Sequence, residues 1–189
     1  MGQYYKIVFY DYDENKKKII RMALVPFQGY KIMEHSYIDN DTMNHIELLL
    51  SPLSPFYKSR IIWTGDYADN EDDNTNNLYH LCDNELPDRS FSISDKIVKK
   101  IVKNISRSRY NIIINHTKNQ YINKDDYRDR DEERCIHPLS LLVCDGNGRG
   151  GGDYRGINDD LCGLWKDDII SMNDTIPDNY IYFNPKFEE

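Results

Sequence analysis

The chain has no apolar segment long enough to cross a membrane. A transmembrane helix needs roughly 18 or more consecutive apolar residues, and no run in the 189 residues approaches that length. The opening residues, Met1 to Lys6, are polar and aromatic, so they also lack the apolar core of a signal peptide. These two absences predict a soluble cytoplasmic protein with no membrane partner.

Cysteine and the common catalytic motifs are also scarce. The four cysteines, Cys82, Cys135, Cys144 and Cys162, include no Cys-x-x-Cys pair. Without an export signal, such cysteines are expected to be thiols and not disulfides. A zinc site built from them with His137 is the alternative, although structural zinc sites usually have closely spaced ligands. No H-E-x-x-H, G-x-S-x-G or Walker sequence occurs.

The length predicts a single domain, residues 1–189, that buries a core without disulfide or metal support. Only 39% of the residues are hydrophobic and the mean hydropathy is −0.74, which is low for a compact fold. Fifteen tyrosines and six phenylalanines offset this deficit, because aromatic side chains bury large areas. We therefore expect a globular domain with polar insertions near 70–77 and 124–134, and not a disordered chain.

The net charge of −8 argues against indiscriminate nucleic-acid binding, which depends on neutralising phosphates. The charge is unevenly spread, however. Residues 65–88 contain eight acids and no Lys or Arg, whereas residues 96–109 contain six basic residues and no acid. A predicted basic helix over 95–107 is therefore the segment suited to nucleic acid or to an acidic partner. The alternative is the ordinary solvated face of an amphipathic helix.

Alternating, β-branched and aromatic segments predict two β-hairpins. Residues 4–12 and 18–24 form the first, and residues 110–115 and 120–123 form the second, across a turn at 116–119. Four further strands or extended segments are expected over 60–63, 139–144, 165–172 and 180–187.

Two helices complete the prediction. The first begins at Asp41 or Thr42 and ends at Leu50, before Pro52, and the second is the basic helix, where Ser92 and Asp95 make a capping box. Residues 30–37 fit either a strand or irregular structure. Because no regular βαβ alternation occurs, the predicted class is α+β, with a mainly antiparallel sheet covered by one or two helices.

The most informative segment is glycine-rich: Asp145 to Gly156 holds six of the ten glycines. Glycine lets backbone amides approach a ligand closely, and concave rows of amides bind phosphate and other anions. The segment contains G-x-G-x-x-G, but the helix that a dinucleotide fold requires does not follow. A glycine-rich connection packed between strands is the alternative. The predicted ligand-binding residues are Gly148, Arg149, Gly150, Gly151, Gly152, Asp153, Arg155 and Trp63.

A second segment, Trp63 to Asp69, combines an indole with carboxylates. Asp66 and Asp69 have the oxygen ligands that Mg²⁺ and Ca²⁺ prefer, and either is a candidate general base. The alternative is that both satisfy turn amides, as aspartates commonly do. Trp63 is suited to stacking on a base, although an indole buried in the core is the commoner arrangement.

Among the five histidines, His116 and His137 are candidate acid–base residues because histidine suits that role near neutral pH. His116 lies in a predicted hairpin turn, and His137 precedes the strand that leads to the glycine-rich segment. With Asp66, Asp69 and Asp153 they make up the candidate catalytic set. A surface or hydrogen-bonded histidine is the alternative for each.

Four motifs stand out: the MGQYYK start, a GYKxMEHSY segment at 29–37, a WxGDYAD turn at 63–69 and a GNGRGGGDY loop at 146–154. Together they resemble a family of uncharacterised proteins from bacteria, their phages and large DNA viruses. Matches at 115–118, 137–139 and 163–168 extend the resemblance over most of the chain. The resemblance implies a viral or bacterial origin, with the host cytoplasm as the location of a viral protein. It implies no reaction and no cofactor.

The sequence therefore predicts a binding protein that recognises a small anionic ligand or a partner protein through its glycine-rich segment. The alternative is a metal-assisted hydrolase or transferase that acts on a phosphate-bearing substrate, with Arg149 and Arg155 holding the phosphate. The enzyme hypothesis requires the glycine-rich segment, the 63–69 turn and a histidine to converge. Oligomeric state, cofactor and metal are left open by the residues.

Overall fold

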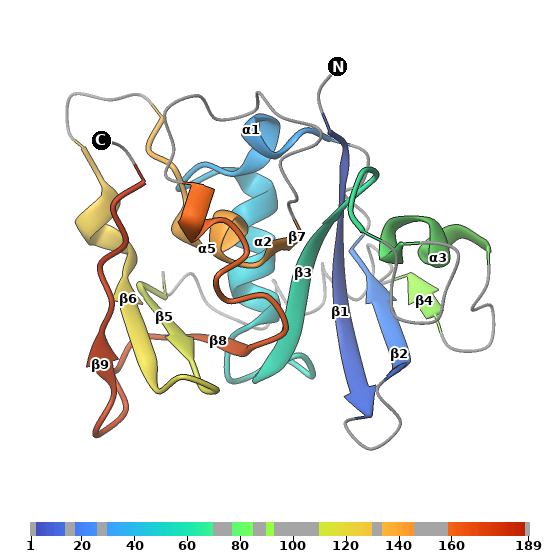
Figure 1. The fold of residues 1–189 in the computed structure, drawn as a ribbon. Helices are drawn as coiled ribbons and strands as arrows, with labels where there is room; N and C mark the ends of the chain where they lie inside the picture. The colour runs from blue at the N-terminus through green and yellow to red at the C-terminus, as the bar shows by residue number, and fades with distance from the viewer. Residues whose placement is uncertain are drawn as a thin grey trace.

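A computed structural model describes residues 3–13, 18–25, 30–69, 77–84, 90–92, 110–129, 134–145 and 159–187. These residues form one nine-stranded sheet with helices packed against it (Figure 1). The main order of the strands is β4-β2-β1-β3-β8-β5-β6-β9, and β7 pairs with β3. In the described ranges, no helix is long and apolar enough to span a membrane.

The first half of the sheet is the predicted N-terminal hairpin extended by one strand. β1 (Tyr5–Asp13) pairs antiparallel with β2 (Lys18–Leu24), and β3 (Ser59–Gly65) pairs antiparallel with β1 on its other side. The short β4 (Ser90–Ser92) lies parallel to β2 at the edge. The alternation of β1 predicted this hairpin correctly.

The second half contains the other predicted hairpin. β5 (Ile112–Asn115) and β6 (Gln120–Asn123) pair antiparallel across the 116–119 turn, and β8 (Ile169–Asn173) joins them to β3. Two short strands, β7 (Cys144–Asp145) and β9 (Ile181–Tyr182), are parallel to β3 and β6. Five of the eight strand pairs are thus antiparallel, which confirms the mainly antiparallel α+β class.

The helices lie on both sides of the first three strands. α1 (Ile32–His35), α2 (Asp41–Leu49) and α5 (Pro138–Leu142) gather on one side of β3, and α3 (Leu78–Asn84) lies beyond β1 on the other (Figure 1). The ambiguous segment 30–37 contains α1. The predicted basic helix over 95–107 lies outside the described residues.

The expected cap of α2 was one or two residues too late. The cap is Asn40, whose side-chain oxygen accepts from the Thr42 N–H at 2.8 Å. Asn, Asp and Thr all serve as caps, so three capping residues in a row leave the start undetermined. Asn40 has the extended backbone that an N-cap adopts, whereas Asp41 is already helical.

The predicted strand over 139–144 was wrong. Residues 138–142 form α5, and only Cys144 and Asp145 are extended. Pro138 occupies the first turn, where its missing N–H costs nothing, and the His137 side chain caps the helix by accepting from Leu139 N–H. A short apolar run is compatible with either structure, and here the cap and the proline favour the helix.

Three further expectations need correction. The charged insertion begins with a 3₁₀ helix, η1 (Lys124–Tyr127), whose first residue is buried and not exposed. Asn77, placed in the polar loop 70–77, is buried and its side chain donates to two backbone carbonyls. Residues 165–168 form a turn before β8, preceded by η2 (Asp159–Leu161), so the extended segment begins only at Ile169.

The sheet has a large core on one face and a small core on the other. In β1 and β3, the side chains of Ile7, Phe9, Ile61 and Trp63 join the large cluster against α1, α2 and α5. Those of Val8, Tyr10 and Ile62 join a smaller cluster with Leu78 of α3. Since strand side chains alternate between faces, Lys6 and Thr64 lie on the face of the smaller cluster.

Candidate functional site

Three buried polar residues lie side by side across three strands. Lys6 of β1 is the register partner of Thr64 of β3, which is the partner of Asp145 of β7. We call these three residues the polar row. They share the face of the smaller core, because register partners on neighbouring strands point to the same side. Lys6, Thr64 and Asp145 are 5%, 0% and 9% exposed, so the row is enclosed by protein.

A turn that packs closely against β7 adds a fourth residue, Lys166, beside the polar row. Gly163 has φ of 75°, and a Cβ there would lie 2.7 Å from the Cys144 carbonyl oxygen. Glycine therefore lets the 161–168 turn lie against β7. This contact brings Lys166 to Asp145, where its Nζ donates to Oδ1 at 2.7 Å. The Lys166 side chain is about one-third exposed, so it links the buried Asp145 of the polar row to solvent.

The residues of the polar row differ in whether their buried polar atoms have hydrogen-bond partners. Lys6 Nζ donates to the Tyr79 carbonyl at 2.8 Å and lies 4.0 Å from the centre of the Tyr79 ring. Within the described part of the chain, Thr64 Oγ1 and Asp145 Oδ2 are buried and have no hydrogen-bond partner. Buried polar atoms are nearly always hydrogen-bonded. Two such oxygens on adjacent strands therefore mark the row as a candidate ligand site.

The glycine-rich segment begins at Asp145, so its remaining residues follow the polar row directly in the chain. Residues 146–158 lie outside the described residues, and with them all predicted ligand-binding residues except Trp63. These positions remain predictions: Gly148, Arg149, Gly150, Gly151, Gly152, Asp153 and Arg155.

Trp63 lies on the opposite face of the sheet from Thr64. Its indole is fully buried in the large core, and its Nε1 donates to His35 Nε2 at 2.8 Å. Burial lowers the pKa of His35 to about 4, against the opposing effects of the Lys31 carbonyl and Glu34. His35 is therefore neutral and accepts from the indole. The structure does not bring Trp63 to the polar row.

The two aspartates of the 63–69 turn have different surroundings. Asp66 Oδ1 accepts from the backbone N–H of Tyr4 at 3.0 Å, and the Asp66 carbonyl accepts from Asn77. This arrangement ties the N-terminal strand to the turn, in agreement with the structural alternative for Asp66. Asp69 is exposed. Nowhere in the described ranges do three His, Cys, Asp or Glu side chains form a group that could hold a metal ion.

His116 follows β5 and lies between two hydroxyl groups. Its Nε2 is 2.8 Å from Ser171 Oγ and its Nδ1 is 3.0 Å from Tyr180 Oη. Burial and the nearby charge of Lys58 lower the pKa of His116 to about 4, so the ring is neutral at pH 7. Serine beside a base resembles a nucleophile pair, but Ser171 is completely buried. The contacts hold β8 against the residue that precedes β9 (Ile181–Tyr182).

His137 belongs to a buried charged cluster in the large core. Its Nε2 donates to Glu47 Oε1 at 2.9 Å, and Lys124 Nζ forms an ion pair with the same oxygen. Burial lowers the pKa of His137. Burial alone would raise the pKa of Glu47, but hydrogen bonds and charge from His137 and Lys124 outweigh it and lower that pKa. The pair is thus Glu47 carboxylate with Lys124 ammonium, beside a neutral imidazole.

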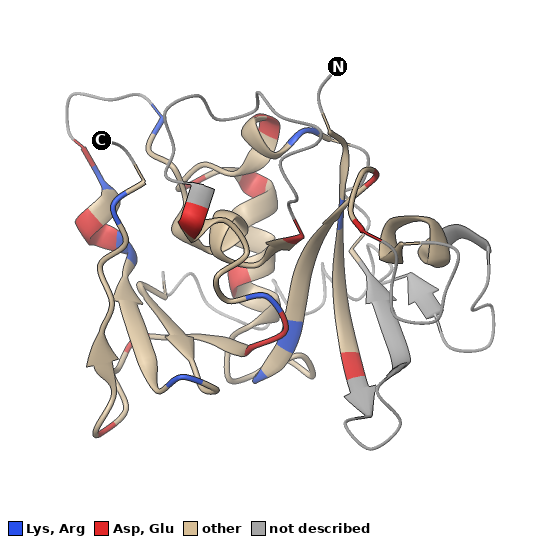
Figure 2. Cartoon of the chain, viewed as in Figure 1, with Lys and Arg blue, Asp and Glu red and all other residues tan. Residues whose placement is uncertain are grey.

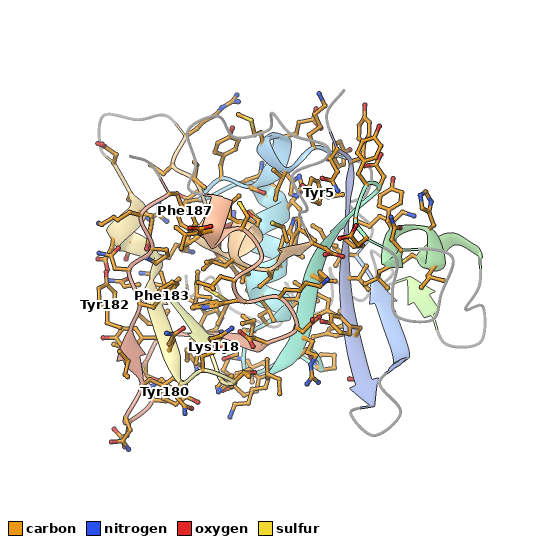
Figure 3. The ribbon with its side chains drawn as sticks, in the orientation of Figure 1. Tyr5, Lys118, Tyr180, Tyr182, Phe183 and Phe187 are labelled. Carbon is orange, nitrogen blue, oxygen red and sulfur yellow. The ribbon has the colours of Figure 1, made fainter. Side chains whose placement is uncertain are left out.

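Among the described candidate residues, Asp66 follows the end of β3 and His116 lies near its start, so these residues do not form one cluster. The polar row lies at the end of β3, beside Tyr5. The His116 N–H instead bonds to the carbonyl of Ile169, whose register partner Arg60 is the second residue of β3. Figure 3 shows Tyr5 well apart from Lys118 and Tyr180, which flank His116. Over the described residues, charges of both signs are interspersed along the ribbon (Figure 2), and the predicted acidic and basic patches fall largely outside it.

Sequence reasoning did not find Lys6, Thr64 and Lys166. Lys6 could have been noticed in the sequence, because it lies between aromatic and aliphatic residues of a predicted strand. A lysine is rarely buried at such a position unless it has a partner. Thr64 and Lys166 have none, because their positions depend on strand register and on the turn against β7. Comparison with protein-family models, curated proteins and solved structures gives no match for this chain.

Proposed function

We propose that this protein binds a small anionic ligand where β3 and β7 end, through the polar row, Lys166 and the glycine-rich segment. The observation that carries the proposal is the position of two lysines, Lys6 in the polar row and Lys166 on Asp145, beside the start of the glycine-rich segment. Asp145 ends β7, and the segment that follows it holds six of the ten glycines of the sequence. Carboxyl ends of parallel strands are common ligand sites.

The charges near the row support an anion. Among the described residues at the row, Lys6 and Lys166 are positively charged and Asp145 is negatively charged. Lysine binds phosphate as a point charge, and glycine amides add neutral donors. A cation would have to approach two ammonium groups, so the same charges disfavour it.

A metal-assisted hydrolase or transferase is the second candidate, and recognition of a partner protein through the same segment is the third. His116 lies near the start of β3, away from the Asp66 turn, and His137 is fully buried beside Glu47. A metal-assisted enzyme would therefore draw on Asp145 or Asp153. Both alternatives predict results different from those of simple anion binding, and one set of measurements distinguishes them.

Thermal unfolding with added ligands tests the proposal. Inorganic phosphate, ribose 5-phosphate and ATP are each added with and without Mg²⁺. At about 100 times Kd, a ligand specific for the folded state adds about 2.7 kcal/mol of stability, so Tm should rise by several degrees with at least one anion. Lys166→Gln and Arg149→Ala should reduce this rise. Lys58→Gln, an exposed lysine at the opposite end of β3, is the matched control and should retain it.

Each other outcome counts against simple anion binding. A rise that is equal in Lys166→Gln, Arg149→Ala and the control variant places binding elsewhere. A rise that requires Mg²⁺ favours the metal-assisted enzyme, and an assay for phosphate release follows. No rise with any anion favours a partner protein.

A further inference from the structure

The C-terminal edge of the sheet presents a row of outward-facing backbone groups. β9 is the last strand in the order, and among the described strands it pairs only with β6. Figure 1 shows β9 at the outer border of the fold, with no described helix or strand beyond it. The N–H groups of Ile181 and Phe183 donate to carbonyls of the β6 segment. Backbone direction alternates along a strand, so the N–H and carbonyl of Tyr182 point away from β6.

Side-chain contacts hold the residues around β9 in place along this edge. The Tyr182 hydroxyl donates to Asp126 at 2.6 Å. The Tyr127 hydroxyl lies 3.1 Å from both the Asn184 side-chain oxygen and the Pro185 carbonyl. An edge that is already ordered loses less conformational entropy when another strand pairs with it.

The same edge lacks the usual protection against strand pairing. Exposed sheet edges are commonly protected by charged side chains, proline or bulges. Residues 179–184 contain neither a charge nor a proline. Two of their apolar side chains are instead exposed, Ile181 to 70% and Tyr182 to 41%. This edge is therefore suited to backbone pairing with a further strand.

The charges at the two ends of the edge favour a second copy of this chain as that further strand. When two copies pair antiparallel with Tyr182 opposite itself, Tyr180 lies opposite Asn184 of the second copy. All outward-facing residues of 180–184 are then paired, and no like charges meet between them. Asp178, in the turn before Tyr180, comes to the end where Lys186 of the second copy lies. Both side chains are exposed, and their charges are opposite.

We propose that two copies of this chain pair antiparallel along β9, about a twofold axis at Tyr182, and so form one continuous sheet. A twofold axis gives a closed dimer, the commonest symmetric assembly of soluble proteins. Because each copy contributes one short strand, the interface is small and the dimer should be weak. The polar row lies at the end of β3, so this dimer is independent of anion binding.

Sedimentation velocity of the full chain, from low micromolar to near-millimolar concentration, tests the proposal. The sedimentation coefficient should rise from that of a monomer to that of a dimer. Tyr182→Pro removes the outward N–H at the axis and should raise the dimer Kd about tenfold or more, since two symmetry-related hydrogen bonds are lost. Proline is tolerated at an edge position whose N–H faces solvent. Tyr182→Ala loses the same side-chain contacts but keeps the N–H, so it should still dimerise.

A charge series tests the register. Lys186→Glu places like charges at both ends of the strand pair and should raise Kd about fivefold. The double variant Asp178→Lys/Lys186→Glu restores opposite charges and should recover the original Kd. Arg134→Glu makes the same charge change at an exposed residue beside Tyr37, away from β9, and should leave Kd unaltered. Melting curves show whether each variant folds.

The outcomes decide the proposal in either direction. A chain that stays monomeric at the highest concentration overturns it and leaves β9 to a strand of another protein. A dimer that is unaffected by Tyr182→Pro, or weakened equally by Tyr182→Ala, is not built on the backbone of β9, which also overturns it. If Tyr182→Pro does not fold, the charge series decides. Weakening in Lys186→Glu with recovery in the double variant supports the pairing, and an equal Kd in all charge variants contradicts it.

Discussion

At the scale of single residues, Thr64 is the clearest conflict between stability and function. Its side chain is fully buried and its hydroxyl has no hydrogen-bond partner in the described part of the chain. Leaving a buried polar group unpaired costs about 1–3 kcal/mol, whereas an apolar group of the same shape carries no such cost. A residue that lowers stability at the end of a core strand is typical of a binding site.

Thr64→Val should therefore raise the free energy of unfolding without ligand by about 1 kcal/mol, measured by urea denaturation. The matched control is Thr117→Val, because Thr117 Oγ1 accepts from the Ile169 N–H at 2.9 Å. Removing that partnered hydroxyl should lower stability by a similar amount. A loss of stability in Thr64→Val would show that its hydroxyl has a partner in the protein.

At the scale of elements, the buried ion pair joins η1 to α2. Lys124 lies in η1 and Glu47 in α2, and the side chains are 1% and 6% exposed. The alternating pattern of β6 predicted the strand before η1 but gave no sign that the first charged residue after it turns inward. Lys124 does so because Glu47 and His137 form a buried acceptor site in the large core.

Lys124→Met should destabilise the protein by about 3–5 kcal/mol, since it leaves the Glu47 carboxylate buried without its cation. The double variant Lys124→Met/Glu47→Gln should recover a large part of that loss, because it removes the uncompensated charge. Urea denaturation of both single variants and the double variant gives the coupling energy. Additive effects of the two changes would contradict a direct ion pair.

At the scale of the whole molecule, buried histidines make stability depend on pH. The pKa values of His35 and His116 are lowered by burial to about 4, and that of His137 is lowered as well. All three are neutral in the folded protein, so the unfolded chain binds more protons between about pH 6.5 and 4. Their contribution is fully present above pH 6.5 and is lost as the pH falls toward 4.

Unfolding in urea at pH 7.5, 6 and 5 should therefore show a stability that falls on acidification. The lowered pKa of His35 alone should reduce the free energy of unfolding by roughly 3 kcal/mol between pH 7.5 and pH 4. His35→Gln keeps an acceptor near Trp63 and should flatten the pH dependence, whereas His80→Gln, at an exposed histidine, should leave it unchanged. Equal stability at pH 7.5 and 5 would show that these histidines are not neutral in the fold.

Both hairpins and the antiparallel α+β class were determined by the sequence itself. Their signals are local: alternation with a period of two, β-branched residues and a turn of polar residues between the strands. The helical α5 was mistaken for a strand because five apolar residues carry no period, and a cap decides between the two structures. The cap of α2 was missed for the related reason that three neighbouring residues are all good caps.

The polar row was decided only by the tertiary structure. Lys6, Thr64 and Asp145 come from three strands that are far apart in the sequence. Their alignment in space depends on the registers of the β1–β3 and β3–β7 pairs. Lys166 reaches Asp145 because Gly163 lets the preceding turn approach the Cys144 carbonyl. Register and close backbone approach are non-local, since they result from how the core packs. The sequence therefore drew attention to the glycine-rich segment, and packing determined which buried oxygens lie beside its start.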